Sequence, residues 1–265
     1  MTPLRSSLVL SLLLALPALG QGSGASGKPI PVGPAIPEDP AVLKVIEPLA
    51  AEIRATFDLP LVPAPQGLFR GRRGEENLLG YWVADAMRQA GQAILGQPVR
   101  FAITNAGGLR ANLRPGQLKV GDIFELMPFE NELVVVELTG AEVIQVLKEG
   151  VARRGGEPIS GVRVKVEGTP GQASISVTWD DGSPIDPASV VKVATSDYLY
   201  GGGDSIPTLK RGRKPFTTGQ TLRQVLLDHC AALAKAQKSL LQPAPGRYTI
   251  PVPIQEAIRD KTFSF

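Results

Sequence analysis

Three consecutive glycines, Gly201, Gly202 and Gly203, separate a predicted strand and turn from a single carboxylate in the segment TSDYLYGGGD. Glycine has no Cβ and tolerates positive φ, so the main chain can pass close to a ligand or to another backbone here. The preceding run, residues 190–195, is rich in β-branched residues and predicts a buried strand. Ligands of α/β proteins bind at such strand ends, where Asp204 would meet them. Taken alone, the motif also fits a tight turn with a capping aspartate.

A second glycine pair follows another predicted strand, residues 99–104. The segment NAGGLR places Asn105, Gly107 and Gly108 directly after that strand, with Arg110 close behind. A guanidinium group offers a fork of donors that suits a carboxylate or a phosphate. Without other information, the segment is equally well explained as a turn with a solvated arginine.

Phe129 occupies a polar loop just before the predicted strand 132–138. A phenylalanine in a loop is often a lid over the core. Phe129 and Tyr198 can instead sandwich a planar ring, with each contributing about 1 to 3 kcal/mol of stacking by analogy with bases on aromatic side chains. Asn131, which comes two residues after Phe129, is then placed to read the edge of that ring.

Alternating helical and strand-like patterns run along the rest of the chain and predict a mixed α/β fold. Period-two alternation and apolar runs predict strands at 99–104, 132–138, 162–167, 173–179 and 190–195, and helical spacing predicts helices at 40–57, 76–87, 140–151 and 220–235. Thr139 and Glu142 fit a capping box at the start of the third of these helices.

Composition limits the classes of function. The 265 residues are 43% hydrophobic and 20% charged, enough to bury a full core. The net charge of +3 comes from 28 basic and 25 acidic residues with only local clusters, which does not indicate a nucleic-acid-binding surface. The single cysteine, Cys230, excludes an intrachain disulfide and is expected to be buried, and the single histidine, His229, is expected to be a packed or surface residue of its helix.

Four regions are expected along the chain. Residues 1–20 contain Arg5, an apolar run too short to cross a bilayer of roughly 30 Å, and a small-residue end, which indicates a secretory signal peptide. Residues 21–39 are rich in Gly, Pro and Ser and indicate a linker. A domain over 40–250 and a tail over 251–265 follow. We therefore expect an exported protein, periplasmic or secreted, without a membrane span.

Four segments also match a known family in order: EENLLGYWVADAM, NAGGLR, VGDIFELMPFENELVVVELTG and TSDYLYGGGD. Over roughly residues 40–250 the chain resembles the C-terminal, substrate-binding domain of 5'-nucleotidases. The resemblance implies a layered sandwich of mixed sheets and helices. It also implies that Phe129 and Tyr198 clamp a nucleobase and that Asn131 and Asp204 hydrogen-bond the nucleoside.

The resemblance assigns the phosphate to arginines, here Arg110 and, at a position where the spacing varies, Arg72. Three residues depart from the usual pattern of the family: Ser196 stands where Asn is usual, Tyr198 where Phe is frequent, and Glu130 where Gly is common. The tyrosine keeps a ring, whereas Glu130 adds a negative charge that is expected to weaken phosphate binding or to alter the choice of ligand.

Complete enzymes of this family also carry a metallophosphatase domain whose two metal ions are held by several His, Asp and Asn residues. One histidine cannot provide such a cluster, and the sequence has no G-x-S-x-G motif for another hydrolytic mechanism. We assign no catalytic residue or cofactor to this chain, and divalent metals are implied only in a separate catalytic domain.

The leading hypothesis is a nucleotide- or nucleoside-recognition domain that acts with a separate metallophosphatase chain in nucleotide breakdown. The alternative is a non-catalytic periplasmic protein that binds nucleosides or nucleotides. A third possibility is a scaffold that has lost the pocket.

Overall fold

The computed structural model describes residue 31 and residues 33–265. The predicted signal peptide and most of the predicted linker therefore lie outside the described residues. The described chain divides into two units between Ile46 and Glu47. Helix α1 (Pro40–Phe57) spans this division and has the predicted bounds. Pro40 occupies its first position, where the fixed φ of proline suits a helix and its missing N–H is no loss.

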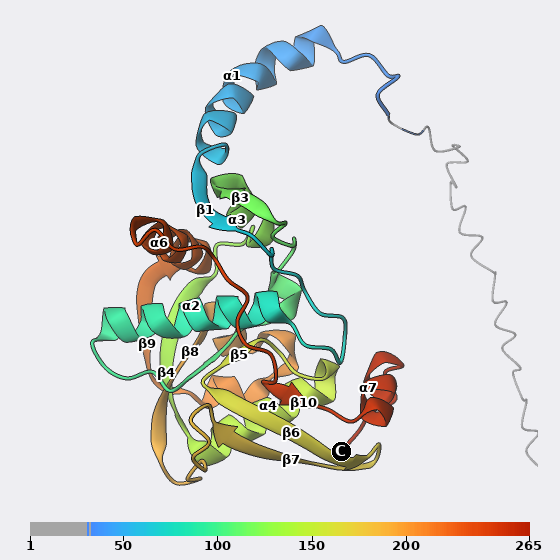
Figure 1. Cartoon of the computed structure of the whole chain (residues 1–265), viewed down its shortest axis with the longest axis vertical. Helices are drawn as coiled ribbons and strands as arrows, with labels where there is room; N and C mark the ends of the chain where they lie inside the picture. The colour runs from blue at the N-terminus through green and yellow to red at the C-terminus, as the bar shows by residue number, and fades with distance from the viewer. Residues whose placement is uncertain (1–30, 32) are drawn as a thin grey trace, which may run out of the picture. The chain divides into compact units, whose positions relative to one another are not determined.

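A five-stranded mixed sheet is the largest in residues 47–265 (Figure 1). Its strand order is β5-β2-β8-β4-β9, with β2 parallel to β8 and every other neighbouring pair antiparallel. The strands are β2 (Phe101–Ile103), β4 (Glu132–Thr139), β5 (Ile159–Ser160), β8 (Val190–Ser196) and β9 (Arg213–Thr221).

Both faces of this sheet are covered, which explains the nearly continuous apolar run of β4. Leu133 and Val135 point into a core formed with helices α2 (Leu78–Leu95) and α6 (Leu222–Lys235). Val134 and Val136 point into a second core on the other face, formed with α4 (Gly140–Arg154) and a smaller sheet. The mixed, layered α/β fold expected from the sequence is confirmed.

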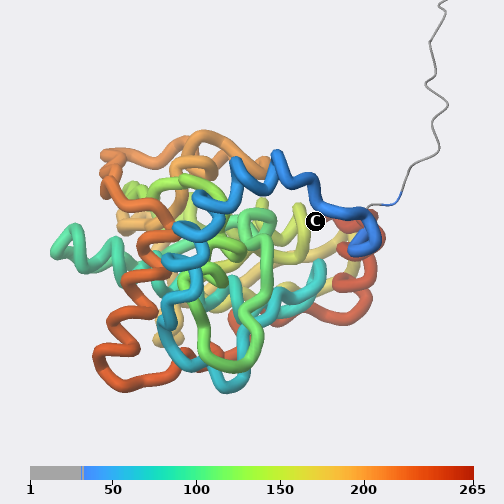
Figure 2. The backbone as a smooth tube through the Cα atoms, turned by 90° about the horizontal axis from the view of Figure 1, so that it is seen from above, coloured from blue at the N-terminus to red at the C-terminus, as the bar shows by residue number. Residues whose placement is uncertain are grey.

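Two smaller sheets complete the strands, a three-stranded sheet in the order β10-β6-β7 and a two-stranded sheet β1-β3. After α6 the chain crosses to β10 and α7, as both views show (Figure 1 and Figure 2). The remaining elements are β1 (Pro60–Ala64), β3 (Gly116–Lys119), β6 (Val162–Thr169), β7 (Gln172–Trp179), β10 (Tyr248–Thr249), α3 (Val120–Leu126), α5 (Asp197–Tyr200), α7 (Val252–Arg259) and the 3-10 helices η1 (Ala106–Gly108), η2 (Gly203–Ser205) and η3 (Pro207–Arg211).

Local sequence signals explain several boundaries. Thr139 and Glu142 form the predicted capping box of α4, with the Glu142 carboxylate accepting the Thr139 N–H at 2.7 Å. Helix α2 begins at Leu78, because the Asn77 side chain caps it by accepting the Gly80 N–H at 2.9 Å. The helix predicted over 76–87 therefore starts later and runs on to Leu95.

Several elements were not predicted, among them strand β9 and helix α7. Strand β9 forms the edge of the five-stranded sheet beside β4, and its sequence is polar and contains a proline, as an edge strand tolerates. Helix α7 lies within the expected tail and buries Ile254 and Ile258 in the second core. Cys230 is fully buried, as predicted. No helix in the described part of the chain combines the length and apolar character needed to span a bilayer.

Candidate functional site

Three loops surround a cavity of about 600 Å³ at one edge of the five-stranded sheet. Their common location follows from the topology. Strands β2 and β8 are parallel and end at this edge, whereas β4 is antiparallel to β8 and begins there. The cavity is lined by Asn105, Gly107, Gly108, Arg110, Phe129, Glu130, Asn131, Tyr198 and Asp204. Segments far apart in sequence thus bring most of the predicted binding residues together.

Two aromatic side chains are presented to solvent at this cavity. Phe129 is 42% exposed and Tyr198 is 44% exposed, so neither ring is a lid buried on the core. The ring contacts found within residues 33–265 join other aromatic pairs, so the two rings do not stack on each other. Both rings are therefore exposed to a planar ligand that enters the cavity.

The glycines after β8 do not themselves line the cavity, but Gly203 supports the Tyr198 ring. A Cβ on Gly203 would lie 2.4 Å from the Tyr198 ring, so the ring packs directly on this backbone. Gly202 has a φ of +96°, a left-handed conformation that disfavours other residues. Gly203 therefore acts through the position of Tyr198, whereas a Cβ on Gly202 would meet the Lys210 side chain at 2.7 Å.

Asp204 carries an unused acceptor. Its Oδ1 accepts hydrogen bonds from Arg153 Nη2 at 2.7 Å and from the Tyr198 hydroxyl at 3.3 Å. Its Oδ2 is buried and has no hydrogen-bond partner among the described residues. Leaving a buried acceptor unpaired costs about 1 to 3 kcal/mol, and a ligand N–H or O–H would remove that cost.

Asn131 and Glu130 both have partners next to the cavity. Asn131 Nδ2 donates to Asp197 Oδ1 at 3.0 Å, which fixes the orientation of the amide. Glu130 is ion-paired with Arg223, which lies over the Phe124 ring at 4.3 Å. The negative charge that distinguishes Glu130 from the usual glycine is thus balanced by a neighbouring cation.

Arg110 lies next to Phe129 in this cavity. Its guanidinium carbon is 5.7 Å from the centre of the Phe129 ring, and its Nη1 donates to the Gly107 carbonyl at 3.2 Å. The cation therefore borders the place where a planar ligand would meet Phe129.

Arg72 does not line this cavity and lies in a neighbouring one of about 310 Å³. Ala106 of η1 lines the second cavity, whereas Gly107 and Gly108 of the same helix line the first. The two cavities therefore flank one short loop. The second is lined by Arg70, Gly71, Arg72, Arg73, Asn77, Ala106, Asn112 and Arg154.

Four guanidinium groups meet at this second cavity. Arg70 Nη1 donates to the Leu109 carbonyl at 2.6 Å, and Arg73 donates to the carbonyl of Arg153. The buried Nε of Arg73 has no partner in the described part of the chain. Such a cavity suits an anion. The basic run 70–73 is evident in the sequence, whereas Arg154 carries no such signal, because it reads as an ordinary cation in the last turn of a helix.

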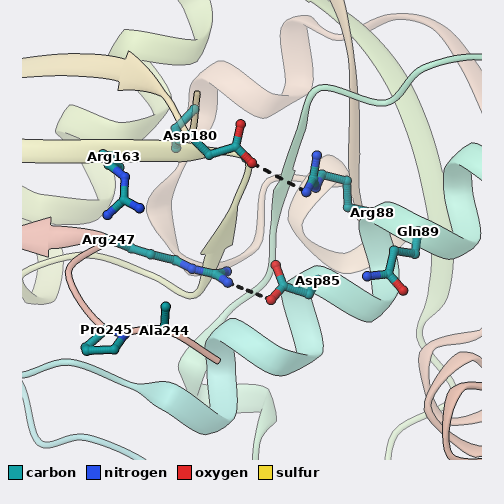
Figure 3. Close-up of a pocket in the computed structure, with 10 residues that line it drawn as sticks. Asp85, Arg88, Gln89, Arg163, Asp180, Ala244, Pro245 and Arg247 are labelled. Atoms are coloured by element: carbon teal, nitrogen blue, oxygen red, sulfur yellow. Dashed lines mark hydrogen bonds and ion pairs between the residues drawn. The ribbon is translucent and has the colours of Figure 1, made fainter. Parts of the chain in front are cut away.

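A third cavity, of about 250 Å³, lies beside α2 and is lined by charged side chains (Figure 3). Four of these groups form two ion pairs: Arg247 contacts Asp85 at 2.6 Å, and Arg88 lies 3.6 Å from Asp180. The fifth, Arg163, donates to the Gly246 carbonyl at 3.2 Å. Arg88 also donates to the Ser160 hydroxyl at 2.8 Å. The contacts tie α2 to the strands beside it and to the segment before β10, so we assign this cavity a structural role.

The residues present do not fit a two-metal centre. Within residue 31 and residues 33–265, no group of three or more His, Cys, Asp or Glu side chains is placed to hold a metal ion. His229 packs edge-on against Trp82, with the ring centres 5.9 Å apart, and burial lowers the pKa of its imidazole.

Known proteins are similar to this chain in sequence. The family model described as "5'-nucleotidase, C-terminal domain" matches residues 60–211. Similar curated proteins include the trifunctional nucleotide phosphoesterase YfkN of Bacillus subtilis, 31% identical over 50% of this chain and 10% of its own length. Others are the cell wall protein Lmo0130 of Listeria monocytogenes (33%, covering 52% and 19%) and a probable 5'-nucleotidase of Treponema pallidum (30%, covering 48% and 24%). The chain thus spans less than a quarter of the length of each of these relatives.

Solved structures lead to the same assignment. The 5'-nucleotidase precursor of Thermus thermophilus aligns with a TM-score of 0.67 and 25% identity, over 80% of this chain and 43% of that chain. The NAD nucleotidase of Haemophilus influenzae shares the fold, with a TM-score of 0.60 and 20% identity, over 80% of this chain and 41% of that chain. Because the family match covers more than half of the sequence and includes every residue that lines the 600 Å³ cavity, the chain belongs to the 5'-nucleotidase C-terminal domain family.

Proposed function

We propose that this chain is the nucleotide-recognition domain of a 5'-nucleotidase-type phosphohydrolase. The observation that carries the proposal is the meeting of Phe129, Tyr198, Asn131, Asp204 and Arg110 around one cavity from three separate segments. Aromatic faces, an amide, an unpaired carboxylate oxygen and a guanidinium together suit a nucleoside.

The nucleoside occupies the 600 Å³ cavity in this proposal. Phe129 and Tyr198 stack on the two faces of the base, and each exposed ring loses water-accessible area when it does so. Asp204 Oδ2 accepts a hydrogen bond from an N–H or O–H of the ligand, and Asn131 contributes a further polar contact.

The phosphate lies toward the arginines. Arg110 borders the nucleoside cavity, and Arg72 stands in the adjacent one with Arg70 and Arg73. Arginine suits phosphate because its planar fork donates two parallel hydrogen bonds. A nucleotide laid across η1 would therefore direct its phosphate away from the aromatic pair.

Hydrolysis takes place with a second chain. The residues described here do not fit a two-metal centre, so we place the divalent metals in a separate metallophosphatase chain to which this domain presents the phosphate. We place the protein outside the cytoplasm, periplasmic or secreted. The expected signal peptide and the likeness to a cell wall protein support this location.

Isothermal titration with adenosine and AMP, with and without Mn²⁺, tests recognition directly. We expect metal-independent binding in the micromolar range and a loss of about 1 to 3 kcal/mol for each of Phe129→Ala and Tyr198→Ala. Phe216→Ala is the matched control, because Phe216 is 41% exposed and does not line this cavity. Absence of binding by the unaltered chain would refute the proposal.

Hydrolysis assays separate the two functional hypotheses. AMP turnover only after mixing with a metallophosphatase chain supports a split enzyme. Binding without turnover in any such mixture favours the alternative, a periplasmic nucleoside- or nucleotide-binding protein. Metal-dependent turnover by the purified chain alone would contradict both.

A further inference from the structure

A chain of hydrogen bonds runs behind the nucleoside cavity and joins two of its walls. The buried Glu157 carboxylate accepts the Ala106 N–H of η1 at 2.7 Å and Arg153 Nη1 at 2.5 Å. Arg153 Nη2 then donates to Asp204 Oδ1 at 2.7 Å, and the Tyr198 hydroxyl donates to the same oxygen. Neither Arg153 nor Glu157 lines the cavity.

The two walls come from different strands. Ala106 follows β2, whereas Asp204 follows β8, and Arg153 and Glu157 belong to the end of α4 and the loop after it. An i, i+4 pair at a helix end is commonly a local support for that helix. Here Arg153 Nη2 donates to the carboxylate of Asp204, which is far away in sequence. The pair of Arg153 and Glu157 therefore does more than support α4.

The burial of Glu157 costs free energy, and an ion pair that only supported the end of α4 would not require that burial. Its side chain is fully buried, and burial raises the pKa of its carboxyl against the opposing effects of the Ala106 N–H, Arg154 and Arg153. An ionised carboxylate in such a place requires partners, and Arg153 supplies one. The arginine, only 30% exposed, is in turn shared between two carboxylates.

The bond from Arg153 decides which oxygen of Asp204 remains available. Oδ1 is occupied by Arg153 and Tyr198, so Oδ2 is the acceptor left without a partner among the described residues. The backbone of Asp204 has a φ of +54°, a left-handed conformation that is unfavourable for a residue with a side chain. A fixed ion pair helps to hold the carboxylate there.

We infer that Arg153 and Glu157 are positioning residues that set the Asp204 carboxylate and the η1 loop for nucleoside binding. This inference rests on the proposed function. Arg153 acts through Asp204, and Glu157 acts through Arg153 and the Ala106 N–H. Neither residue touches the ligand.

The experiment is a titration of adenosine, which has no phosphate, into matched variants of the purified chain. Arg153→Gln should weaken binding about tenfold, as expected for loss of a hydrogen bond between charged groups. Arg153→Lys should retain part of the affinity, because one ammonium can reach one of the two carboxylates. Arg213→Gln is the control: it breaks an ion pair with Glu142 at the opposite end of α4 and should leave affinity within about twofold.

A double-mutant cycle distinguishes positioning from general support of the fold. Asp204→Asn should weaken adenosine binding in the unaltered chain but add little in the Arg153→Gln background, because both changes remove the same fixed acceptor. Thermal unfolding of each variant identifies any that fails to fold, and Arg153→Lys then supplies the comparison.

The outcomes separate this inference from the function on which it rests. If the unaltered chain binds adenosine and Arg153→Gln binds it equally well, the inference is wrong and the proposed function stands. Additive effects of Arg153→Gln and Asp204→Asn would also overturn it. If the unaltered chain binds neither adenosine nor AMP, the proposed function fails and this inference fails with it.

Discussion

Replacing Gly203 by alanine should displace the Tyr198 ring from the wall of the 600 Å³ cavity while leaving the fold intact. The new Cβ would lie 2.4 Å from two atoms of the Tyr198 ring, at least about 1 Å short of ordinary van der Waals contact. Gly203 does not have a positive φ, so alanine strains the side-chain contact and not the backbone. Tyr198 is 44% exposed, and its ring can therefore swing toward solvent.

The size of the effect on binding depends on the displacement of the Tyr198 ring. Displacing a ring that stacks on a base should cost binding about 1 to 3 kcal/mol, or roughly 5- to 150-fold in the Kd of adenosine. Little buried surface is lost, so the free energy of unfolding should change by less than about 1 kcal/mol.

Titration with adenosine and urea unfolding measure the two quantities separately. Gly201→Ala is the control, because its Cβ would meet only the Asp197 carbonyl at 3.1 Å and the Tyr198 carbonyl at 3.5 Å. Tyr198→Ala should make the Gly203→Ala change silent, since no ring remains to be displaced. Unaltered adenosine affinity in Gly203→Ala, or a loss of several kcal/mol in stability, would refute the reasoning.

Three further predictions concern charge and burial. Arg72→Gln should weaken AMP binding about tenfold and leave adenosine binding unchanged in parallel titrations, because Arg72 lies in the arginine cavity and not among the nucleoside contacts; equal losses for both ligands would contradict this division. The hydrogen bond from Arg213 lowers the pKa of Glu142 from its ordinary 4.5 to about 2. Its ionised form thus stabilises the fold above about pH 4.5, and that contribution is lost as the pH falls toward 2. Urea unfolding at pH 7 and pH 3 should show a smaller acid-induced loss in Glu142→Gln, and an identical loss in both proteins would argue against the assignment. Burial raises the pKa of the Cys230 thiol to about 12, so a thiol reagent at pH 8 should label the chain only after denaturation, and rapid labelling of the folded chain would be inconsistent with this burial.

The location of the 600 Å³ cavity could be predicted in part because many of its signals are local. Apolar runs fix β4 and β8, and glycines beside polar residues mark the places where strands end. Antiparallel pairing of β4 with β8 then brings Phe129 to the same edge as Tyr198. The strands and the loops that follow them depend on short stretches of sequence, whereas the pairing of β4 with β8 joins segments remote in sequence. The grouping of these residues into one site was expected from the resemblance to the 5'-nucleotidase C-terminal domain.

The supporting residues could not be predicted in the same way. Arg153 and Glu157 have an ordinary helix-end spacing, and only the tertiary fold brings them to Asp204 and Ala106. Strand β9 is stabilised by pairing with β4, a contact remote in sequence, and its own residues are polar. Helix α7 did carry a signal, Ile254 and Ile258 at helical spacing, within a segment too short for the periodicity to be decisive.

The separation of the two cavities by η1 bears on the side from which a metal-bearing chain would approach a bound nucleotide. If the base lies between Phe129 and Tyr198, the phosphate must pass Gly107 and Gly108 to reach Arg72. Side chains at these two positions would narrow that path. The two glycines would therefore leave room for the phosphate as well as allow the backbone to turn. The metal-bearing chain would then have to approach from the arginine side, since the scissile bond lies there. Substitutions that reverse charge around Arg72 should accordingly weaken hydrolysis in the mixture more than they weaken adenosine binding.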